Sequence, residues 1–270
     1  MKRLLDYHMH TYFSQDGKMT MEEACRKAIS VGLQEIAFTD HMDIDWPDNK
    51  NAFQITDMDQ YIRAIEAIRT KYRGKLVVKT GIEMGLQDWT LETATSLVEK
   101  YPYDFVIASI HLVDGMDPYL SEYYKNRDKV QSYTDYYQTT YDLLRDYNDF
   151  CVLGHLDYLR RYIPYPYTPG DHKIGTEIIE SILKLLIQKG KGLELNTAGY
   201  KHISKQPHPH PDILKRYREL GGEIVTIGSD AHSAPYVGYE NRRALEWLKY
   251  AGFDYVTSFT EGKPNFVKIT

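Results

Sequence analysis

Histidine and acidic residues stand at the ends of nearly all the short apolar stretches in this sequence. Imidazole nitrogens and carboxylate oxygens together form a donor set that suits zinc, iron or manganese. A single histidine at such a place is more often an ordinary polar residue, but chance does not explain the repeated placement. The donors outnumber the ligands that one tetrahedral ion needs, so we expect more than one divalent metal ion. These residues are His8, His10, His41, Glu83, His111, His155, Asp230 and His232.

The apolar stretches alternate with longer amphipathic patterns, which is typical of βα units around a parallel sheet. Strands are predicted at residues 4–8, 35–40, 76–84, 105–111, 151–155, 192–197 and 223–230, with a weaker eighth strand at residues 253–259. Helices are predicted at residues 20–32, 57–72, 90–101, 133–147, 173–190, 211–220 and 241–252. Because all strands of a parallel barrel end on one face, residues as distant as His8 and His232 can share one pocket.

The composition argues against several classes of protein. A formal net charge of −5 and a pI of about 6.1 leave no basic face for a nucleic-acid backbone. We therefore expect a small substrate, and a phosphorylated one is possible because a single phosphate can be held locally. The only cysteines, Cys25 and Cys151, cannot build a disulfide framework, which fits a reducing cytoplasm. No signal-peptide pattern and no stretch of membrane-spanning length is found.

Short motifs surround the candidate ligands. They are His8-Met9-His10, Thr39-Asp40-His41, Glu83 after Gly81, Ser109-Ile110-His111, Gly154-His155 and Ser229-Asp230-Ala231-His232. Together and in this order they resemble the motifs of the polymerase-and-histidinol-phosphatase (PHP) superfamily, over the whole chain. Each motif alone is weak, but the combination is specific. The segments GHLDYLRRY and LELNTAGYK are most similar to the histidinol-phosphate phosphatases of that superfamily.

The resemblance implies an α/β fold, namely a distorted seven-stranded TIM-like barrel that forms a single domain over residues 1–270. It also implies a centre of two to three divalent ions. One ion would be held by His8, His10, Glu83 and Asp230, a second by Glu83, His111 and His155, and a third by Asp16, His41 and His232. Family members often have a histidine where this chain has Asp16, so Asp16 could instead be a solvated loop residue.

Such a centre would hydrolyse a phosphate ester without a protein nucleophile. Clustered metal ions lower the pKa of a shared water from 15.7 in bulk to roughly 7, and the hydroxide attacks phosphorus in line. Asp230 and His232 are candidates for the acid, or its relay, that protonates the leaving alkoxide. Arg160 and Arg161 follow the fifth predicted strand, and a guanidinium fork suits a terminal phosphate. Of these two arginines we favour Arg160.

Other polar residues have more than one interpretation. Asp40 is interpreted as a residue that orients a ligand. Asn196 could contact substrate or be a satisfied loop amide. Asp43 and Asp45 could meet an ammonium group, and aromatic loop residues could stack on an imidazole ring. His202, His208 and His210 lie in a proline-rich loop. The pair His208 and His210 looks like a second HxH motif, but we interpret the pair as exposed loop because the flanking prolines break a strand.

Three functions are compared. The leading hypothesis, which comes from the resemblance, is hydrolysis of L-histidinol phosphate to L-histidinol and phosphate in histidine biosynthesis. A second is a phosphoesterase for nucleotides or nucleic-acid ends, which the acidic chain argues against. A third is a metal-binding module without catalytic activity. The completeness of the donor set at the strand ends argues against this module.

Overall fold

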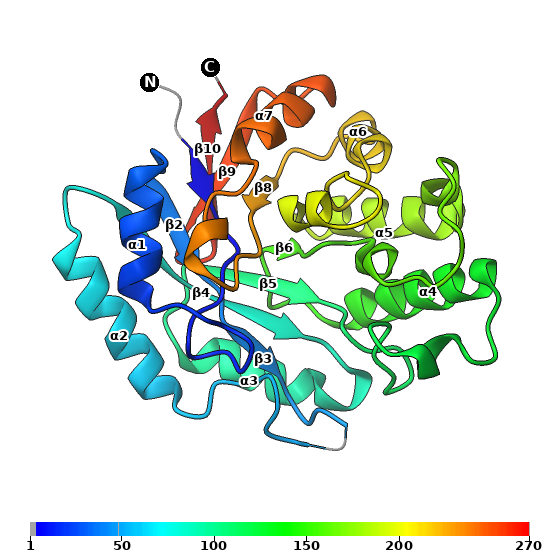
Figure 1. Ribbon diagram of the computed structural model, residues 1–270, viewed down its shortest axis with the longest axis horizontal. Coiled ribbons are helices and arrows are strands. Elements are labelled where there is room, and N and C mark those ends of the chain that lie inside the picture. The colour runs from blue at the N-terminus through cyan, green and yellow to red at the C-terminus, as the bar shows by residue number, and fades with distance from the viewer. Residues whose placement is uncertain (1–3, 48, 270) are drawn as a thin grey trace.

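The computed structural model describes residues 4–47 and 49–269 as an α/β barrel in which helices surround a parallel sheet (Figure 1). The strands run in the order β1-β2-β4-β5-β6-β7-β8, and β3 also pairs with β4. They are β1 (Leu5–Asp6), β2 (Glu35–Phe38), β3 (His41–Asp43), β4 (Val77–Gly85), β5 (Phe105–Ser109), β6 (Val152–Leu153), β7 (Gly192–Asn196) and β8 (Val225–Gly228). The predicted distorted TIM-like barrel is confirmed.

The barrel closes where the chain after β1 meets the chain after β8. The amide of Tyr7 donates to the carbonyl of Ile227 at 2.8 Å, and the amide of Asp230 donates to the carbonyl of His8 at 2.8 Å. These bonds continue beyond the ends of both strands, β1 being only two residues long. His8 and Asp230 therefore leave the barrel as neighbours.

The second predicted strand is divided in two. β2 ends at Phe38, and β3 begins at His41 after the intervening Thr39 and Asp40. β4 is long enough to pair with both pieces, and His41 lies directly beside Glu83 in this pairing. The division therefore brings two predicted metal ligands into adjacent positions on the sheet.

Seven α-helices of the described residues cover the barrel at the places predicted. They are α1 (Met21–Ser30), α2 (Met58–Lys71), α3 (Leu91–Lys100), α4 (Lys129–Asp146), α5 (Thr176–Gln188), α6 (Pro211–Glu219) and α7 (Asn241–Tyr250). Polar residues cap several of them: Thr20 and Glu23 form a reciprocal capping box, and Asp57 accepts from the amide of Gln60 at 2.8 Å. Within the described residues, none of the helices combines the length and apolar character needed to cross a membrane.

The tyrosine-rich helix α4 packs against the barrel. Tyr133, Tyr136 and Tyr137 are all buried. The hydroxyl of Tyr136 donates to the carbonyl of Ile110 at 3.1 Å, immediately before His111. Helix α4 therefore anchors the start of the loop that carries His111.

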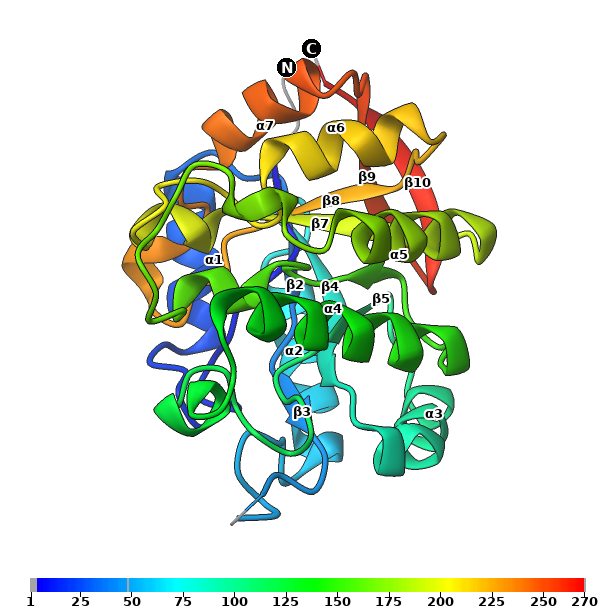
Figure 2. The ribbon, with the colours of Figure 1, turned by 90° about the vertical axis from the view of Figure 1, so that its right-hand side faces the viewer.

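The predicted eighth strand forms, but it lies outside the parallel sheet. β9 (Tyr255–Thr260) pairs antiparallel with β10 (Lys263–Lys268) in a separate hairpin, which Figure 2 shows beside β8. Phe259 of β9 contacts Phe105, the first residue of β5, with ring centroids 5.1 Å apart. Its amide donates to the Tyr7 hydroxyl at 2.9 Å. The hairpin therefore covers the amino ends of the strands and leaves their carboxyl ends open for a site.

Candidate metal centre

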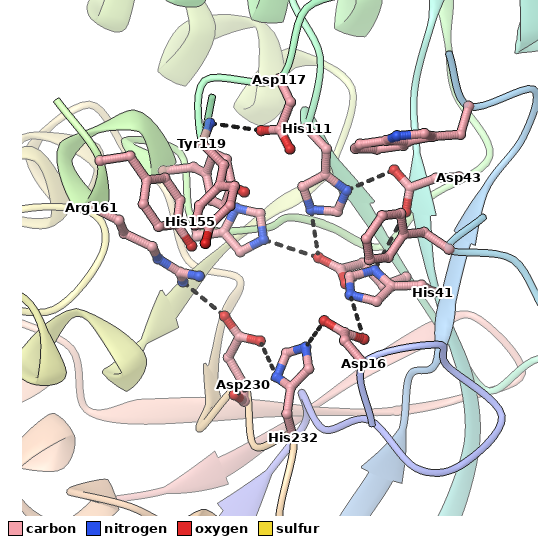
Figure 3. A pocket seen from close by; sticks show the side chains of 15 residues that line it. Asp16, His41, Asp43, His111, Asp117, Tyr119, His155, Arg161, Asp230 and His232 are labelled. Carbon is pink, nitrogen blue, oxygen red and sulfur yellow. Dashed lines mark hydrogen bonds and ion pairs between the residues drawn. The ribbon is translucent and has the colours of Figure 1, made fainter. Parts of the chain in front are cut away.

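All the predicted metal ligands lie together at the carboxyl ends of the strands. Figure 3 labels those that line the pocket, namely Asp16, His41, His111, His155, Asp230 and His232. His8 and His10 follow β1, His41 lies on β3, Glu83 on β4, His111 follows β5, His155 follows β6, Asp230 and His232 follow β8, and Asp16 comes from the loop between β1 and α1. The parallel topology brings these side chains from the whole length of the chain into one pocket.

Glu83 is at the centre of the cluster. Its Oε2 is 3.2 Å from Nε2 of His8 and 2.9 Å from Nδ1 of His41. Its Oε1 is 2.9 Å from Nε2 of His155 and 3.4 Å from Nε2 of His111. The two oxygens of one buried carboxylate thus face different sets of histidines, which is the arrangement of a ligand that bridges two ions.

Asp16, His41 and His232 form the outer corner of the cluster. Oδ2 of Asp16 is 2.9 Å from Nε2 of His232, and its Oδ1 is 3.8 Å from Nε2 of His41. The ring of His10 stacks on the rings of both histidines, with centroids 4.1 Å apart in each pair. Asp16 therefore belongs to the cluster and is not a separate loop carboxylate.

Asp230 connects the cluster to the wall of the pocket. Its Oδ1 is 3.4 Å from Nε2 of His10 and 3.8 Å from Nε2 of His8, while its Oδ2 is 2.8 Å from Nη2 of Arg161. The φ angle of Asp230 is 51°, in the left-handed region that aspartate and asparagine tolerate better than most residues. The turn after β8 therefore suits one of these two residue types.

Two buried carboxylates orient the histidines from behind. Nδ1 of His8 donates to Glu194 at 2.7 Å, and Nδ1 of His111 donates to Asp43 at 2.7 Å. Each bond fixes the tautomer of the ring and turns its Nε2 toward Glu83. The sequence analysis missed Glu194, although a carboxylate inside the apolar run GLEL was a usable signal.

Asp40 plays a similar part for the loop that carries Asp16. It accepts hydrogen bonds from the amide of Thr11 at 2.6 Å and from the hydroxyl of Ser14 at 2.8 Å. Ser14 in turn accepts from the amide of His41 at 2.9 Å. Asp40 thus orients ligand-bearing segments, in line with its interpretation from the sequence.

The donor atoms of the cluster fit divalent metal ions. Nε2 of His8 and of His10, Nδ1 of His41 and Oε2 of Glu83 are buried and have no hydrogen-bond partner among the described residues. Buried polar atoms are rarely left in this state, so their concentration here indicates ligands of cations. Donor triplets within 4.8 Å of one another are His8–His10–Asp230, His8–Glu83–His155, His41–Glu83–His111 and His10–His41–His232.

The charges within the cluster shift its pKa values strongly. Burial lowers the pKa of His8 and His41, but nearby carboxylates outweigh it and hold both pKa values well above normal. Burial, together with His41 and His232, lowers the pKa of His10 to about 3. Burial raises the pKa of Glu83, but the surrounding imidazoles hold it well below its usual value. Metal ions bind unprotonated imidazole, so metal binding here would release protons.

The cluster opens into a cavity of about 340 Å³, a size that suits a small molecule (Figure 3). Arg161 lies on its inner wall. On its outer wall, Asp117 accepts from the amide of Tyr119 at 2.7 Å, and burial raises the pKa of Asp117. The aromatic residues that line the cavity are Trp46, Phe53, Tyr119, Tyr158 and Tyr162. The cavity therefore offers a guanidinium cation, a carboxylate and several aromatic rings around the cluster.

Arg161, not the favoured Arg160, reaches the cavity. Nη2 of Arg161 is 2.8 Å from Asp230 and 3.1 Å from Oδ1 of Asn196. Arg160 points away and pairs with Asp157 at 2.5 Å. Asn196 is fully buried and does not line the cavity, so it is a satisfied amide. The preference for Arg160 is wrong because the side chains of the two adjacent arginines point to different partners, Arg160 to Asp157 and Arg161 to Asp230.

The prediction of an exposed proline-rich loop is wrong for His208 and His210, which are buried, whereas His202 is half-buried. The backbone of His208 forms an antiparallel bridge with Asn196 at the end of β7. Its ring Nδ1 bonds to the buried carboxylate of Asp157. The flanking prolines do not prevent these contacts because the bridge uses the amide and carbonyl of His208 itself.

His208 is expected to make the fold sensitive to mild acid. Burial lowers its pKa from 6.5 to about 4. Between these values the unfolded chain binds a proton that the folded chain does not, so stability falls as the pH falls, by about 1.4 kcal/mol per pH unit. Urea unfolding of the wild type and of His208→Asn at about pH 7 and about pH 5 measures this term. The advantage of the wild type over the variant should shrink at the lower pH. A pH-independent difference contradicts the assignment.

The sequence is similar to those of known proteins over nearly its whole length. The PHP domain family matches residues 6–198. The chain is 31% identical to the histidinol-phosphatase of Lactococcus lactis, over 95% of this chain and 94% of that protein. It is 34% identical to a probable histidinol-phosphatase of Clostridium acetobutylicum, over 90% of this chain and 92% of that protein.

Solved structures give a similar result. The crystal structure of the histidinol phosphate phosphatase of L. lactis, in complex with zinc, L-histidinol and phosphate, matches with a TM-score of 0.89 at 30% identity, over 97% of this chain and 99% of that one. A putative histidinol phosphatase of Listeria monocytogenes matches with a TM-score of 0.79 at 18% identity, over 88% of this chain and 99% of that one, and supports the fold alone.

Proposed function

We propose that this chain, which belongs to the PHP domain family and within it to the histidinol-phosphatases, hydrolyses L-histidinol phosphate to L-histidinol and inorganic phosphate in histidine biosynthesis. The observation that carries the proposal is the buried cluster of histidines around Glu83, which faces a small cavity with an arginine on its wall. The two free cysteines, Cys25 and Cys151, are buried and fit a cytoplasmic location.

Two to three divalent ions would be held by this cluster, and zinc is bound to the relative from L. lactis. We assign His8, His10, Glu83 and Asp230 to one ion, Glu83, His111 and His155 to a second, and Asp16, His41 and His232 to a third. Manganese and iron suit the same donors. When bound, such ions lower the pKa of water from 15.7 to roughly 7 and neutralise charge on phosphoryl oxygens.

Arg161 would bind the phosphate. Its Nη2 is held by Asp230 and Asn196, which fixes the plane of the guanidinium group, while its Nε is buried without a hydrogen-bond partner among the described residues. A fixed guanidinium fork suits two oxygens of a terminal phosphate. A diester would have to carry a second substituent toward this arginine, so the arrangement favours monoesters.

The outer wall of the cavity would bind the amino alcohol and its imidazole. The half-buried carboxylate of Asp117 suits an ammonium group, and the aromatic rings that line the cavity suit a flat heterocycle. Asp43 and Asp45, suggested for this role by the sequence, have other partners: Asp43 bonds to His111, and Asp45 pairs with Lys50 at 2.9 Å. We therefore assign the ammonium group to Asp117.

His232 would protonate the leaving alkoxide in the state of the enzyme in which it does not bind the third ion, because a nitrogen bound to metal has no proton to donate. Asp230, the other candidate, faces Arg161 and two imidazoles, all of which favour its ionised form and make it a poor proton donor. The ring of His232 lines the cavity and is held by Asp16 at 2.9 Å. Asp16 therefore fixes this ring at the edge of the cavity, and Nε2 of His232 would exchange its contact with Asp16 for the leaving oxygen when it donates the proton.

The purified protein is expected to release phosphate from L-histidinol phosphate with a kcat/KM at least about a hundredfold above that for p-nitrophenyl phosphate, because only the first substrate uses the outer wall. Removal of metal by a chelator should abolish turnover, and zinc, manganese or iron should restore it. Bis(p-nitrophenyl) phosphate is the control for diester cleavage. Preferred cleavage of this diester would support the nuclease-like alternative, and no turnover with any metal would support a non-catalytic module.

A further inference from the structure

Asp157 is a buried carboxylate that the proposed reaction does not use. It follows β6 two residues after His155 and is completely inaccessible to solvent. One of its oxygens bonds to Nδ1 of His208. The other accepts from Nη1 of Arg160 at 2.5 Å and from the amide of His210 at 3.0 Å. Asp157 thus joins the loop after β6 to the loop after β7.

The first of these loops carries Arg161 itself, and the second pairs with Asn196, which holds Arg161 together with Asp230 of the turn after β8. Within the first loop, Arg160 is bound to Asp157 and to Oε1 of Gln206 at 3.2 Å, and Arg161 is the next residue. In the second loop, the amide of Asn196 donates to the carbonyl of His208 at 2.6 Å, and the amide of His208 donates back at 2.9 Å. Oδ1 of Asn196 then accepts from Arg161 at 3.1 Å.

We propose that Asp157 is a positioning residue for the phosphate, acting from both sides on Arg161: through the adjacent Arg160 and through His208 and Asn196. The inference rests on the proposed phosphate-binding role of Arg161. A buried carboxylate destabilises the fold strongly when it loses its hydrogen-bond and ion-pair partners. Asp157 therefore holds its partners, and with them Arg161, in one arrangement.

A purely structural role would look different from a positioning role. A loosened fold weakens every ligand of the cavity and lowers stability, whereas a displaced Arg161 weakens phosphate alone. Inorganic phosphate and L-histidinol are the two halves of the product pair, and they test the inner and outer walls separately. Inhibition by each is measured in the metal-loaded enzyme, with p-nitrophenyl phosphate as the substrate, so the measurement does not depend on the preference for L-histidinol phosphate.

Asp157→Asn is expected to raise the inhibition constant of inorganic phosphate by about tenfold and to leave that of L-histidinol within about twofold. In the background of Arg161→Met, the same substitution should have no further effect on phosphate, because its target is already absent. Asp171→Asn is the matched control: Asp171 is another buried aspartate of the same loop, but it pairs with Lys129 and Thr168. Its loss should lower stability without changing phosphate inhibition.

A second pair of variants keeps the test decisive if Asp157→Asn does not fold. His208→Asn retains a side-chain N–H near the position of Nδ1, whereas His208→Ala does not. Phosphate inhibition should be nearly that of the wild type in the first and about tenfold weaker in the second. The proposal is overturned if Asp157→Asn weakens inhibition by phosphate and by L-histidinol equally. It is also overturned if the effects of Asp157→Asn and Arg161→Met on phosphate inhibition add in the double variant. Failure of the wild type to hydrolyse L-histidinol phosphate would instead reject the proposed function. Inhibition by phosphate and by L-histidinol could still be compared, because it is measured with p-nitrophenyl phosphate as the substrate.

Discussion

Replacing Glu83 with glutamine is expected to lower kcat/KM for L-histidinol phosphate by more than about a thousandfold. An amide nitrogen carries two hydrogens and no available lone pair, so glutamine has one donor atom for metal where glutamate has two. Loss of a residue that merely orients a ligand already costs about 10–100-fold, and the loss of a bridging ligand costs more. Steady-state kinetics measure the loss of activity, and the metal content of the purified variant measures the loss of bound ions. The two should fall together.

The comparator for Glu83→Gln is Glu194→Gln. Glu194 is equally buried and also faces His8, but from the side away from the cluster. Its loss should cost about 10–100-fold and leave most of the metal in place. If the two variants lost similar activity and retained similar amounts of metal, Glu83 would be an orienting residue and the bridging role would be wrong.

The ligands could be predicted because their positions follow from simple rules. A parallel barrel places every strand end on the same face, so a histidine or carboxylate that closes an apolar stretch is directed to one pocket. His111 and His155 are examples, each two residues beyond the end of a strand. Helix periodicity predicted the outer layer in the same way.

The groups behind the ligands could not be predicted by these rules. Asp43 and Glu194 lie on strands, where a carboxylate can point to the interior or away from it, and their partners come from distant parts of the chain. The direction of Arg160 and Arg161 depends on a tight turn whose orientation is set by Asp157. His208 is buried by a bridge to β7 that leaves no local sequence pattern.

The predicted eighth strand shows a different limit. Alternating apolar residues predict a strand at residues 253–259, which the structure has at Tyr255–Thr260, but they do not specify its partner. The strand pairs antiparallel with β10, which the sequence analysis did not separate from a polar tail. A short connection between two adjacent strands permits antiparallel pairing only. With the second strand recognised, this rule would have predicted the hairpin.

The leaving group is expected to separate the roles of Asp230 and His232. If His232 donates the proton to the alkoxide, His232→Asn lowers hydrolysis of L-histidinol phosphate by about 10²–10⁴-fold and hydrolysis of p-nitrophenyl phosphate by much less, because a nitrophenolate leaves without a proton. Asp230→Asn should lower both rates by a similar factor, since a lost ligand affects both substrates. Asparagine is the appropriate replacement at position 230 because it tolerates the left-handed φ of 51°.

His232 is itself a candidate metal ligand, so the absolute loss in the variant has two causes. Loss of metal slows both substrates together, whereas loss of the proton donor slows only the one with the poor leaving group. Compared at equal metal content, the ratio of the two rates therefore isolates proton donation. A ratio unchanged in His232→Asn would assign His232 to metal binding alone. A changed ratio in Asp230→Asn would assign proton donation to Asp230, although Arg161 faces its carboxylate at 2.8 Å.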